Sequence, residues 1–349
     1  MRMKKLMILA AVAAIAATAC TKTFEVEPTP ANAIGFGTWA NVLTKARTAG
    51  SSTFANGDNF NVYGFKTISA ANTTVFDGDV VAYDGTDWAY TTGLRFWDTN
   101  ASSYTFYAVS PAGNVDSADA ETGEFTSNSI TFTGKNNDIL VADKTTVSKG
   151  SSPYFNNYGK VNLSFNHIAS LVDFKVKKHS EIAAATVAIT SFQISNIDKT
   201  GTFSVASTYA TSNHPDVTWT PTARDTYDNE SGVTSVETLP SNIGTDGSDF
   251  LINHLVAMPQ TFRTTENIQT VSITYTITSG GDTITNSATF NLKTFDNVDD
   301  KDNEDTIIGG WEGGKHYTFY ITINANAIEF TASIVDWLTP NNGYHYLLQ

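Results

Sequence analysis

Residues 160–166 read Lys-Val-Asn-Leu-Ser-Phe-Asn, and in this stretch large apolar side chains alternate with polar ones. Val161, Leu163 and Phe165 therefore point to one face of an extended chain, and the intervening Asn and Ser residues point to the other. An amphipathic helix would instead space its apolar residues three or four positions apart. The stretch predicts a β-strand with one buried face, and it sets the fold class of the chain.

Apolar and alternating runs of this kind recur at even spacing, and Asp-Gly pairs at Asp77-Gly78 and Asp84-Gly85 favour tight hairpins between them. Ser180–Ala185 is long enough for one helical turn. The pattern predicts an all-β protein of sandwiches or barrels. Besides Ile34–Trp39 and the stretch above, the predicted strands are Phe60–Phe65, Val80–Tyr83, Trp88–Tyr90, Tyr104–Val109, Ser129–Phe132, Ile139–Ala142, Leu171–Lys177, Thr186–Ile194, Phe203–Val205, Val217–Trp219, Phe250–Met258, Gln269–Ile277, Thr283–Leu292, His316–Ile323 and Ala327–Trp337.

Length, net charge and cysteine content indicate how many domains the chain has and which partners and sites it disfavours or excludes. A chain of 349 residues favours two domains, and the polar loop 151–157 places the boundary near residue 158. The net charge of −14 disfavours binding to nucleic acid and to anionic membrane surfaces. Apart from Cys20 the chain has no thiol, and this excludes intrachain disulfides and zinc or iron–sulfur centres built on cysteines.

The N-terminus has the layout of a secretory signal. Arg2, Lys4 and Lys5 precede an apolar run over residues 6–19, which is too short to span a bilayer. The single cysteine, Cys20, follows directly, and this position predicts a bacterial lipoprotein with residues 1–19 as signal peptide and lipid on the sulfur. Ala17 stands where such signals usually have Leu, so an ordinary signal peptide remains an alternative.

No catalytic, cofactor or metal site is predicted. The acidic segment Asp296–Asp305 lacks the Gly and Glu positions of a calcium loop and is interpreted as a solvated hairpin loop. The sequence contains neither HExxH nor GxSxG, and the glycines of residues 309–314 lack the context of a phosphate loop. His167 follows Phe165 on a strand and is interpreted as a packed or capped histidine rather than a metal ligand. A secreted hydrolase is therefore the weakest of the functions considered.

Tryptophan suggests one further function. Exposed aromatic rings could bind a glycan, although core anchors are the more common role of tryptophan in β-sandwiches and are favoured here. The alternative function is a monomeric surface lipoprotein that binds glycan, with Trp88 and Trp311 as the first residues to replace. The tryptophans concerned are Trp88, Trp97, Trp219, Trp311 and Trp337.

Several features in a fixed order resemble one family over nearly the whole chain. They are the lipoprotein signal, the strand Ile34–Trp39, Ala46-Arg47-Thr48, Trp97 leading to Tyr104–Pro111, Phe165-Asn-His167, and a terminal hairpin over Tyr317–Trp337. Together they resemble the fimbrillins, the subunits of type V pili of anaerobic Gram-negative bacteria. The resemblance implies two transthyretin-like β-sandwich domains in tandem, no enzymatic activity and no cofactor.

The resemblance also implies maturation. Fimbrillins reach the outer membrane as lipoproteins, and an arginine-specific protease then removes the lipidated segment together with the first strand. The matching cut lies between Arg47 and Thr48, and loss of six basic and two acidic residues lowers the net charge from −14 to −18. On this basis residues 20–47 are a tether and removable first strand, 48–157 are the N-terminal sandwich (with strand 33–39 before cleavage), and 158–349 are the C-terminal sandwich.

Strand removal leaves unpaired backbone groups and an apolar groove, which a neighbouring subunit can fill by strand addition. Ile328, Phe330, Ala332 and Ile334 alternate with less apolar neighbours and form the candidate donor strand. As an alternative, residues 327–337 are an ordinary last strand of the second domain and Tyr344–Leu348 is the donor. The sequence also leaves open whether the subunit belongs to the stalk, the tip or the anchor of the fimbria. The expected partners are other fimbrial subunits, the protease and a host or bacterial surface receptor; the expected location is the outer membrane and fimbria, with membrane contact only through lipid.

Overall fold

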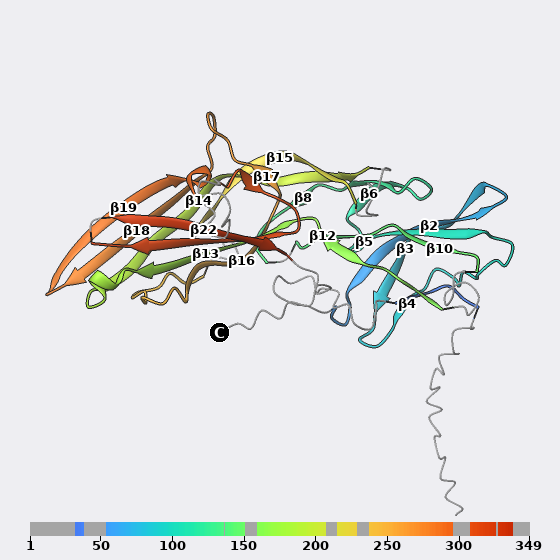
Figure 1. Ribbon diagram of the computed structural model, residues 1–349, viewed down its shortest axis with the longest axis horizontal. Coiled ribbons are helices and arrows are strands. Elements are labelled where there is room, and N and C mark those ends of the chain that lie inside the picture. The colour runs from blue at the N-terminus through green and yellow to red at the C-terminus, as the bar shows by residue number, and fades with distance from the viewer. Residues whose placement is uncertain are drawn as a thin grey trace, which may run out of the picture. The chain divides into compact units, whose positions relative to one another are not determined.

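The computed structural model describes residues 32–37, 54–135, 137–150, 159–206, 215–228, 237–295, 308–325 and 327–337. Over these residues the protein is all-β, which confirms the fold class predicted from the alternation (Figure 1). The one predicted helical turn is present as the 3-10 turn η1 (Ser180–Ile182), and a second, η2 (Leu292–Thr294), follows later in the chain. In this part of the chain no helix has the length and apolar character needed to cross a bilayer.

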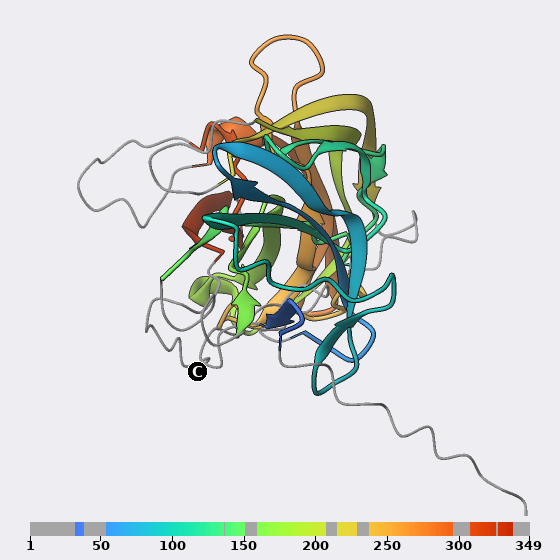
Figure 2. The ribbon, with the colours of Figure 1, turned by 90° about the vertical axis from the view of Figure 1, so that its right-hand side faces the viewer.

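The first sheet has nine strands within the described ranges, in the order β11–β1–β4–β3–β2–β5–β9–β12, with β10 paired to β5. Its long blue and cyan strands are strongly twisted in Figure 2. The strands are β1 (Gly35–Gly37), β2 (Asn59–Ile68), β3 (Ala71–Tyr83), β4 (Trp88–Tyr90), β5 (Ser103–Ser110), β9 (Leu140–Ala142), β10 (Thr145–Ser148), β11 (Lys160–Asn162) and β12 (Phe165–His167).

A four-stranded sheet and a seven-stranded sheet contain most of the remaining described strands. The four-stranded sheet has the order β16–β13–β21–β22, from β13 (Ser170–Lys178), β16 (Asp249–Ala257), β21 (Lys315–Ile323) and β22 (Ile328–Asp336). The seven-stranded sheet has the order β19–β18–β14–β7–β6, with β8 and β15 also on β14, from β6 (Val115–Asp119), β7 (Glu124–Ser127), β8 (Ile130–Thr131), β14 (Thr186–Val205), β15 (Val217–Asp228), β18 (Thr270–Ser279) and β19 (Asp282–Asn291). Strands β17 (Gln260–Thr261) and β20 (Gly310–Trp311) form a separate pair.

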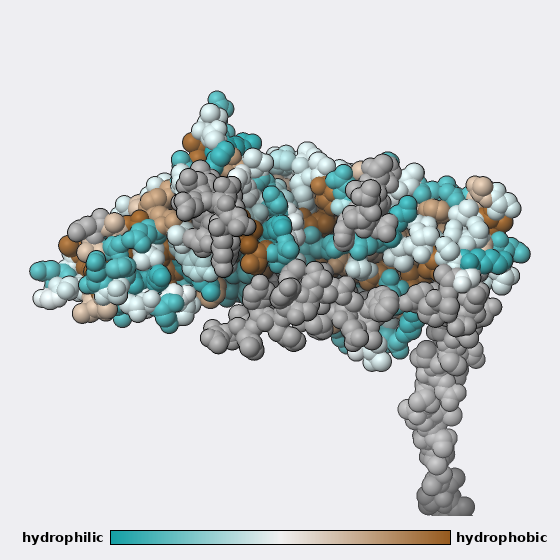
Figure 3. All heavy atoms as spheres, viewed as in Figure 1, coloured by the Kyte–Doolittle hydropathy of each residue, from teal (hydrophilic) through white to brown (hydrophobic). Residues whose placement is uncertain are grey.

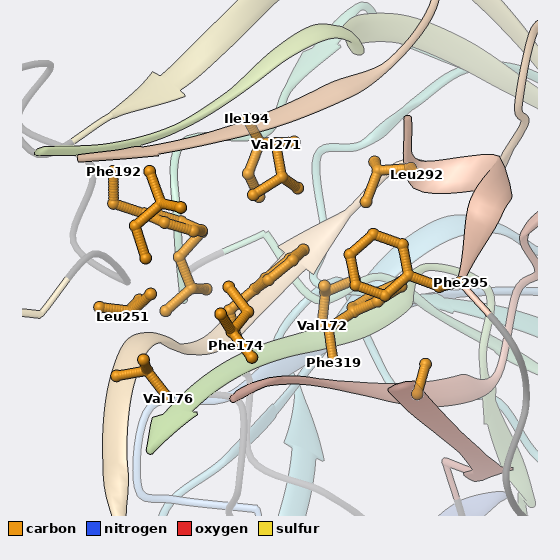
Figure 4. Close-up of a cluster of buried hydrophobic side chains, with 14 of the residues drawn as sticks. Val172, Phe174, Val176, Phe192, Ile194, Leu251, Val271, Leu292, Phe295 and Phe319 are labelled. Atoms are coloured by element: carbon orange, nitrogen blue, oxygen red, sulfur yellow. The ribbon is translucent and has the colours of Figure 1, made fainter. Parts of the chain in front are cut away.

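The core of the second half lies between these two sheets. Phe174 of β13 and Phe319 of β21 are partners on adjacent parallel strands, and their rings stack with centroids 4.6 Å apart. Phe192 and Ile194 of β14 are fully buried against the same cluster, as Figure 4 shows. Alternating residues on facing strands build this core, because every second side chain points inward.

Strands from the two halves of the chain share sheets. β11 and β12 follow residue 158 but join the first sheet, whereas β7 and β8 precede it but pair with β14. A third buried cluster contains residues from both halves, including Tyr107, Phe132, Leu171 and Met258. The division into two transthyretin-like domains at residue 158 stays a prediction.

Two local predictions were wrong. Asp77-Gly78 is not a hairpin turn, because β3 continues through it and its register with β2 shifts there, with Gly78 at a φ of +81°. This geometry is a β-bulge, which glycine accommodates without strain. Asp84-Gly85 does connect the paired strands β3 and β4. The stretches 186–194 and 203–205, predicted as two strands, are parts of the single strand β14.

Candidate functional site

The first described strand, β1, lies inside the nine-stranded sheet between β11 and β4. It runs parallel to β11 over three residue pairs, from Gly35 opposite Lys160 to Gly37 opposite Asn162. Its antiparallel pairing with β4 is limited to Phe36 opposite Trp88. The strand therefore has few backbone partners but occupies an interior position in the sheet.

Aromatic side chains enclose Phe36 on several sides. The ring centroid of Phe36 lies 6.0 Å from that of Phe60, 5.3 Å from Phe76, 6.1 Å from Tyr90 and 5.9 Å from Phe106, in edge-to-face arrangements. Phe36 is 1% exposed. Edge-to-face contacts add to the hydrophobic stabilisation of burial, so the Phe36 side chain is the main anchor of β1.

Ile34, two residues before Phe36 in the sequence, is fixed by hydrogen bonds as well as by burial. Its amide donates to the carbonyl of Arg95 at 2.7 Å, and its carbonyl accepts from the Tyr90 hydroxyl at 2.8 Å. Burial is the main cause that raises the pKa of the Tyr90 phenol, so this hydroxyl stays a donor over the physiological range. The chain entering β1 is thus held in one position.

The predicted processing residues lie outside the described residues: Cys20, Arg47 and Thr48 all do. The structure does describe both flanks of residues 38–53. Gly37 ends β1, and Phe54 packs edge-to-face on Trp88 with centroids 4.8 Å apart. Phe36 and Phe54 belong to the same buried cluster, so the segment containing Arg47 begins and ends at one core.

The predicted donor residues lie together on one face of β22. Ala332 is buried, and Ile328, Phe330 and Ile334 are half-buried against the core of the second half. In the described chain β22 is an edge strand whose sheet partner is β21, with nine residue pairs from Ile323–Ile328 to Lys315–Asp336. The sequence predicted this apolar face, and the structure shows which sheet it completes.

Trp337, directly after β22, contacts the first sheet. Its ring stacks on His167 of β12 with centroids 3.9 Å apart, and its amide donates to the Gly314 carbonyl at 2.6 Å. Nδ1 of His167 lies 2.7 Å from Oδ1 of the buried Asp138. His167 is therefore a packed histidine, as predicted, but its role in holding the end of β22 could not be read from sequence, because its two partners are distant in the chain.

Most of the tryptophans that could have formed a glycan-binding face are buried. Trp88, Trp97, Trp311 and Trp337 are between 2% and 9% exposed, and half-buried Trp219 donates its Nε1–H to the Ile168 carbonyl. The preferred interpretation as core anchors is confirmed for the four buried rings. Apolar residues are scattered over the face shown in Figure 3 rather than gathered in one patch.

The remaining polar clusters in the described ranges do not form a metal centre: no three His, Cys, Asp or Glu side chains there could hold an ion together. Asp173 accepts from the His254 amide, and its carboxylate lies 2.9 Å from Nε2 of His316. Burial, the largest influence, lowers the pKa of His254. The acidic segment Asp296–Asp305 lies outside the described residues.

A family model described as fimbrillin-like matches residues 44–337. The chain belongs to the fimbrillin-like family. This places it in a family of structural fimbrial proteins rather than enzymes. No curated protein sequence matches the chain.

Two solved structures from Bacteroides species align with most of the chain. A fimbrial protein from Bacteroides vulgatus aligns with a TM-score of 0.53 and 17% identity, over 80% of this chain and 93% of that one. A candidate cell adhesion protein from Bacteroides uniformis aligns with a TM-score of 0.49 and 16% identity, over 89% and 100%. At such low identity, the B. vulgatus alignment supports the fold of this fimbrillin-like chain and nothing finer.

Proposed function

We propose that this fimbrillin-like protein is a structural subunit of a cell-surface fimbria of the type V pilus kind, which supports adhesion. In this proposal it is exported as a lipoprotein through Cys20, cleaved between Arg47 and Thr48, and assembled with other fimbrial subunits by strand exchange. The observation that carries the proposal is the position of β1: an interior strand, anchored mainly by Phe36, that precedes the proposed cleavage site.

Cleavage would convert β1 from a covalently joined strand into a bound peptide. Burial of Ile34 and Phe36 contributes roughly 1.5–3 kcal/mol each before ordering costs, and the strand has only three residue pairs with β11. Once cut, the peptide is held by these side chains and by a few backbone hydrogen bonds, including those of Ile34, and a competing strand that makes equivalent contacts can replace it. Its departure would expose the edges of β11 and β4 and a groove lined by Phe60, Phe76 and Phe106.

Strand β22 has the side-chain spacing that this groove needs. Ile328-Glu329-Phe330 repeats the spacing of Ile34-Gly35-Phe36, with Glu in place of the first glycine. A Cβ at Gly35 would lie 3.4 Å from Cγ of Lys160, which is an ordinary contact distance. In the β1 register Glu329 would therefore lie beside Lys160, an exposed lysine that also pairs with Asp87, and a second carboxylate beside this cation supports β22 as donor.

Donation requires β22 to leave its own sheet. Its nine residue pairs with β21 and the burial of Ala332 would be lost unless equivalent contacts form with the next subunit. Tyr344–Leu348, outside the described residues, is the second candidate donor and would leave β22 in place. Either donor makes a head-to-tail contact that does not close on itself, and such contacts build filaments.

The test is digestion of the lipidated precursor with an arginine-specific protease, followed by N-terminal sequencing and size-exclusion chromatography. We expect a new N-terminus at Thr48 and high-mass assemblies, whereas an Arg47→Gln variant stays uncut at this site and monomeric. A product that is cut at Arg47 but remains monomeric would contradict strand exchange.

Charge reversal distinguishes the two donors. Lys160→Glu should slow the assembly of cleaved subunits, and a second change, Glu329→Lys, should restore it if β22 is the donor. If the Lys160→Glu variant assembles at the normal rate, or the second change does not rescue it, Tyr344–Leu348 becomes the better candidate.

A further inference from the structure

Strand β19 forms a margin of the seven-stranded sheet, and in the described chain it pairs with β18 alone (Figure 1). The two strands run in unbroken register from Thr270 opposite Asn291 to Ser279 opposite Asp282, without a bulge. The other edge of such a strand presents a row of backbone N–H and C=O groups. A long regular edge of this kind is a template for pairing with another strand.

The usual features that block edge pairing are missing from β19. Proteins protect sheet margins with lysine, proline, bulges or very short strands. At other margins of the described sheets, β11 and β12 have three residues each, and β22 contains Glu329 and Asp336. The ten residues of β19 include neither lysine nor proline, and their only charge is Asp282 at the first position. The net charge of −14 makes two copies of the chain repel each other in general. The margin formed by β19 adds only the charge of Asp282 to this repulsion.

The outer face of β19 is a ladder of hydroxyl groups shared with β18. Three cross-strand pairs have their oxygens 2.9 Å apart: Ser272 with Thr289, Thr274 with Ser287, and Thr278 with Thr283. On the inner face Ile284 is 61% exposed, while Phe290 is half-buried with its ring centroid 3.6 Å from that of Phe330. The strand is thus held extended with an apolar side chain left in water.

We propose that β19 pairs antiparallel with β19 of a second copy of this chain, about a twofold axis at Ser287. Side chains that are opposite each other in a sheet point to the same face. Because faces alternate along each strand, an even-numbered residue of one copy must lie opposite an even-numbered residue of the other, and an odd-numbered residue opposite an odd-numbered one. The register centred on Ser287 places Ile284 opposite Phe290 of the second copy and Thr285 opposite its Thr289. It extends the hydroxyl ladder, covers the exposed Ile284 and leaves both Asp282 side chains beyond the paired segment.

This contact differs from strand exchange because it is symmetric and closed, so it joins two copies side by side rather than head to tail. It also requires neither cleavage nor release of β1. The inference therefore stands independently of the proposed maturation, and the uncut full chain is the right material for testing it.

The test uses the low cysteine content of the chain. In a Cys20→Ser background, Ser287→Cys introduces the only thiol at the proposed axis, where the two Cβ atoms would lie about 4.5–5.5 Å apart, close enough for a disulfide after small adjustments. Thr283→Cys is the matched control on the same exposed face, because its symmetric mate would lie roughly 27 Å away. We expect oxidised, covalent dimers from Ser287→Cys and monomers from Thr283→Cys, with both variants folded by circular dichroism.

Sedimentation equilibrium of the Cys20→Ser chain gives a second readout that needs no cross-link. Ser287→Lys would place two like charges face to face and should weaken self-association by up to about fivefold. Three outcomes would overturn the proposal. They are equal cross-linking of the two cysteine variants, no cross-linking of either, and a Cys20→Ser chain that is monomeric at every concentration.

Discussion

The first and last described strands, β1 and β22, are held in opposite ways. β1 has three residues, two sheet neighbours and a central phenylalanine that is 1% exposed. β22 has nine residues, a single sheet neighbour in the described chain and an apolar face that is mostly half-buried. The first strand depends on side-chain burial, and the last depends on a long backbone ladder.

This difference suggests how one chain can both lose and lend a strand. A short strand anchored by one enclosed ring leaves a well-defined pocket when it is removed, because the surrounding aromatic residues are already packed into a core. A long edge strand can separate residue by residue, and each step exposes little apolar surface. The proposed acceptor site, which β1 occupies, and the proposed donor, β22, therefore differ in the balance of side-chain and backbone contacts that hold each strand.

The largest expected effect is at Phe36. Phe36→Ala in the uncut chain should cost about 3–5 kcal/mol of unfolding free energy, because it empties the space between four aromatic rings. Phe330→Ala should cost about half as much, since its side chain is only half-buried. Urea unfolding of both variants measures the difference, and equal losses would break the comparison.

Trp337→Ala should cost about 3 kcal/mol, because the ring stacks on His167 and is 7% exposed. The effect should be localised: hydrogen exchange should accelerate at the C-terminal end of β22 and remain unchanged in β1. Val335→Ala is the control, since this side chain on the same strand is 37% exposed and should change stability by less than about 0.5 kcal/mol. Uniform acceleration across both strands would show that Trp337 does not act on β22 specifically.

Tyr90→Phe removes one hydrogen bond to the backbone of Ile34 and should cost about 1 kcal/mol. Burial raises the pKa of this phenol above its ordinary 10.0. Above about pH 10 the unfolded chain loses this proton while the folded chain keeps it, so the contribution is present below that pH and is lost as pH rises through the folded pKa. The variant should therefore lose less stability than the unmodified chain between about pH 9 and pH 11, as measured by urea unfolding at each pH.

The smallest expected effect is at Lys315, which pairs with Asp336 at the end of β22. Their side chains are 36% and 59% exposed, so Lys315→Gln should cost less than about 0.5 kcal/mol, and the cost should vanish at high salt. Thermal unfolding at low and high ionic strength measures it. A loss above about 1 kcal/mol would show that charge, and not the backbone ladder, holds β22 in place.

Much of the candidate site follows from local pattern. The alternation of Ile34 and Phe36 with two glycines predicted a one-sided strand, and the residues from Val161 to Phe165 predicted another, with all of these large side chains now seen to be buried. The apolar face of β22 was equally readable. Side chains in a strand alternate with a period of two whatever the strand pairs with, so the sequence alone determined which face of these three segments would be buried.

Only the tertiary structure decided which segments meet. Strand pairing joins residues far apart in the chain, and no local signal places Phe36 among Phe60, Phe76 and Phe106, or Trp337 against His167. Local sequence also cannot distinguish the bulge at Asp77-Gly78 from a hairpin turn, because glycine accommodates a positive φ in both structures. Partner choice depends on the register and packing of whole sheets, which exist only once the chain has folded.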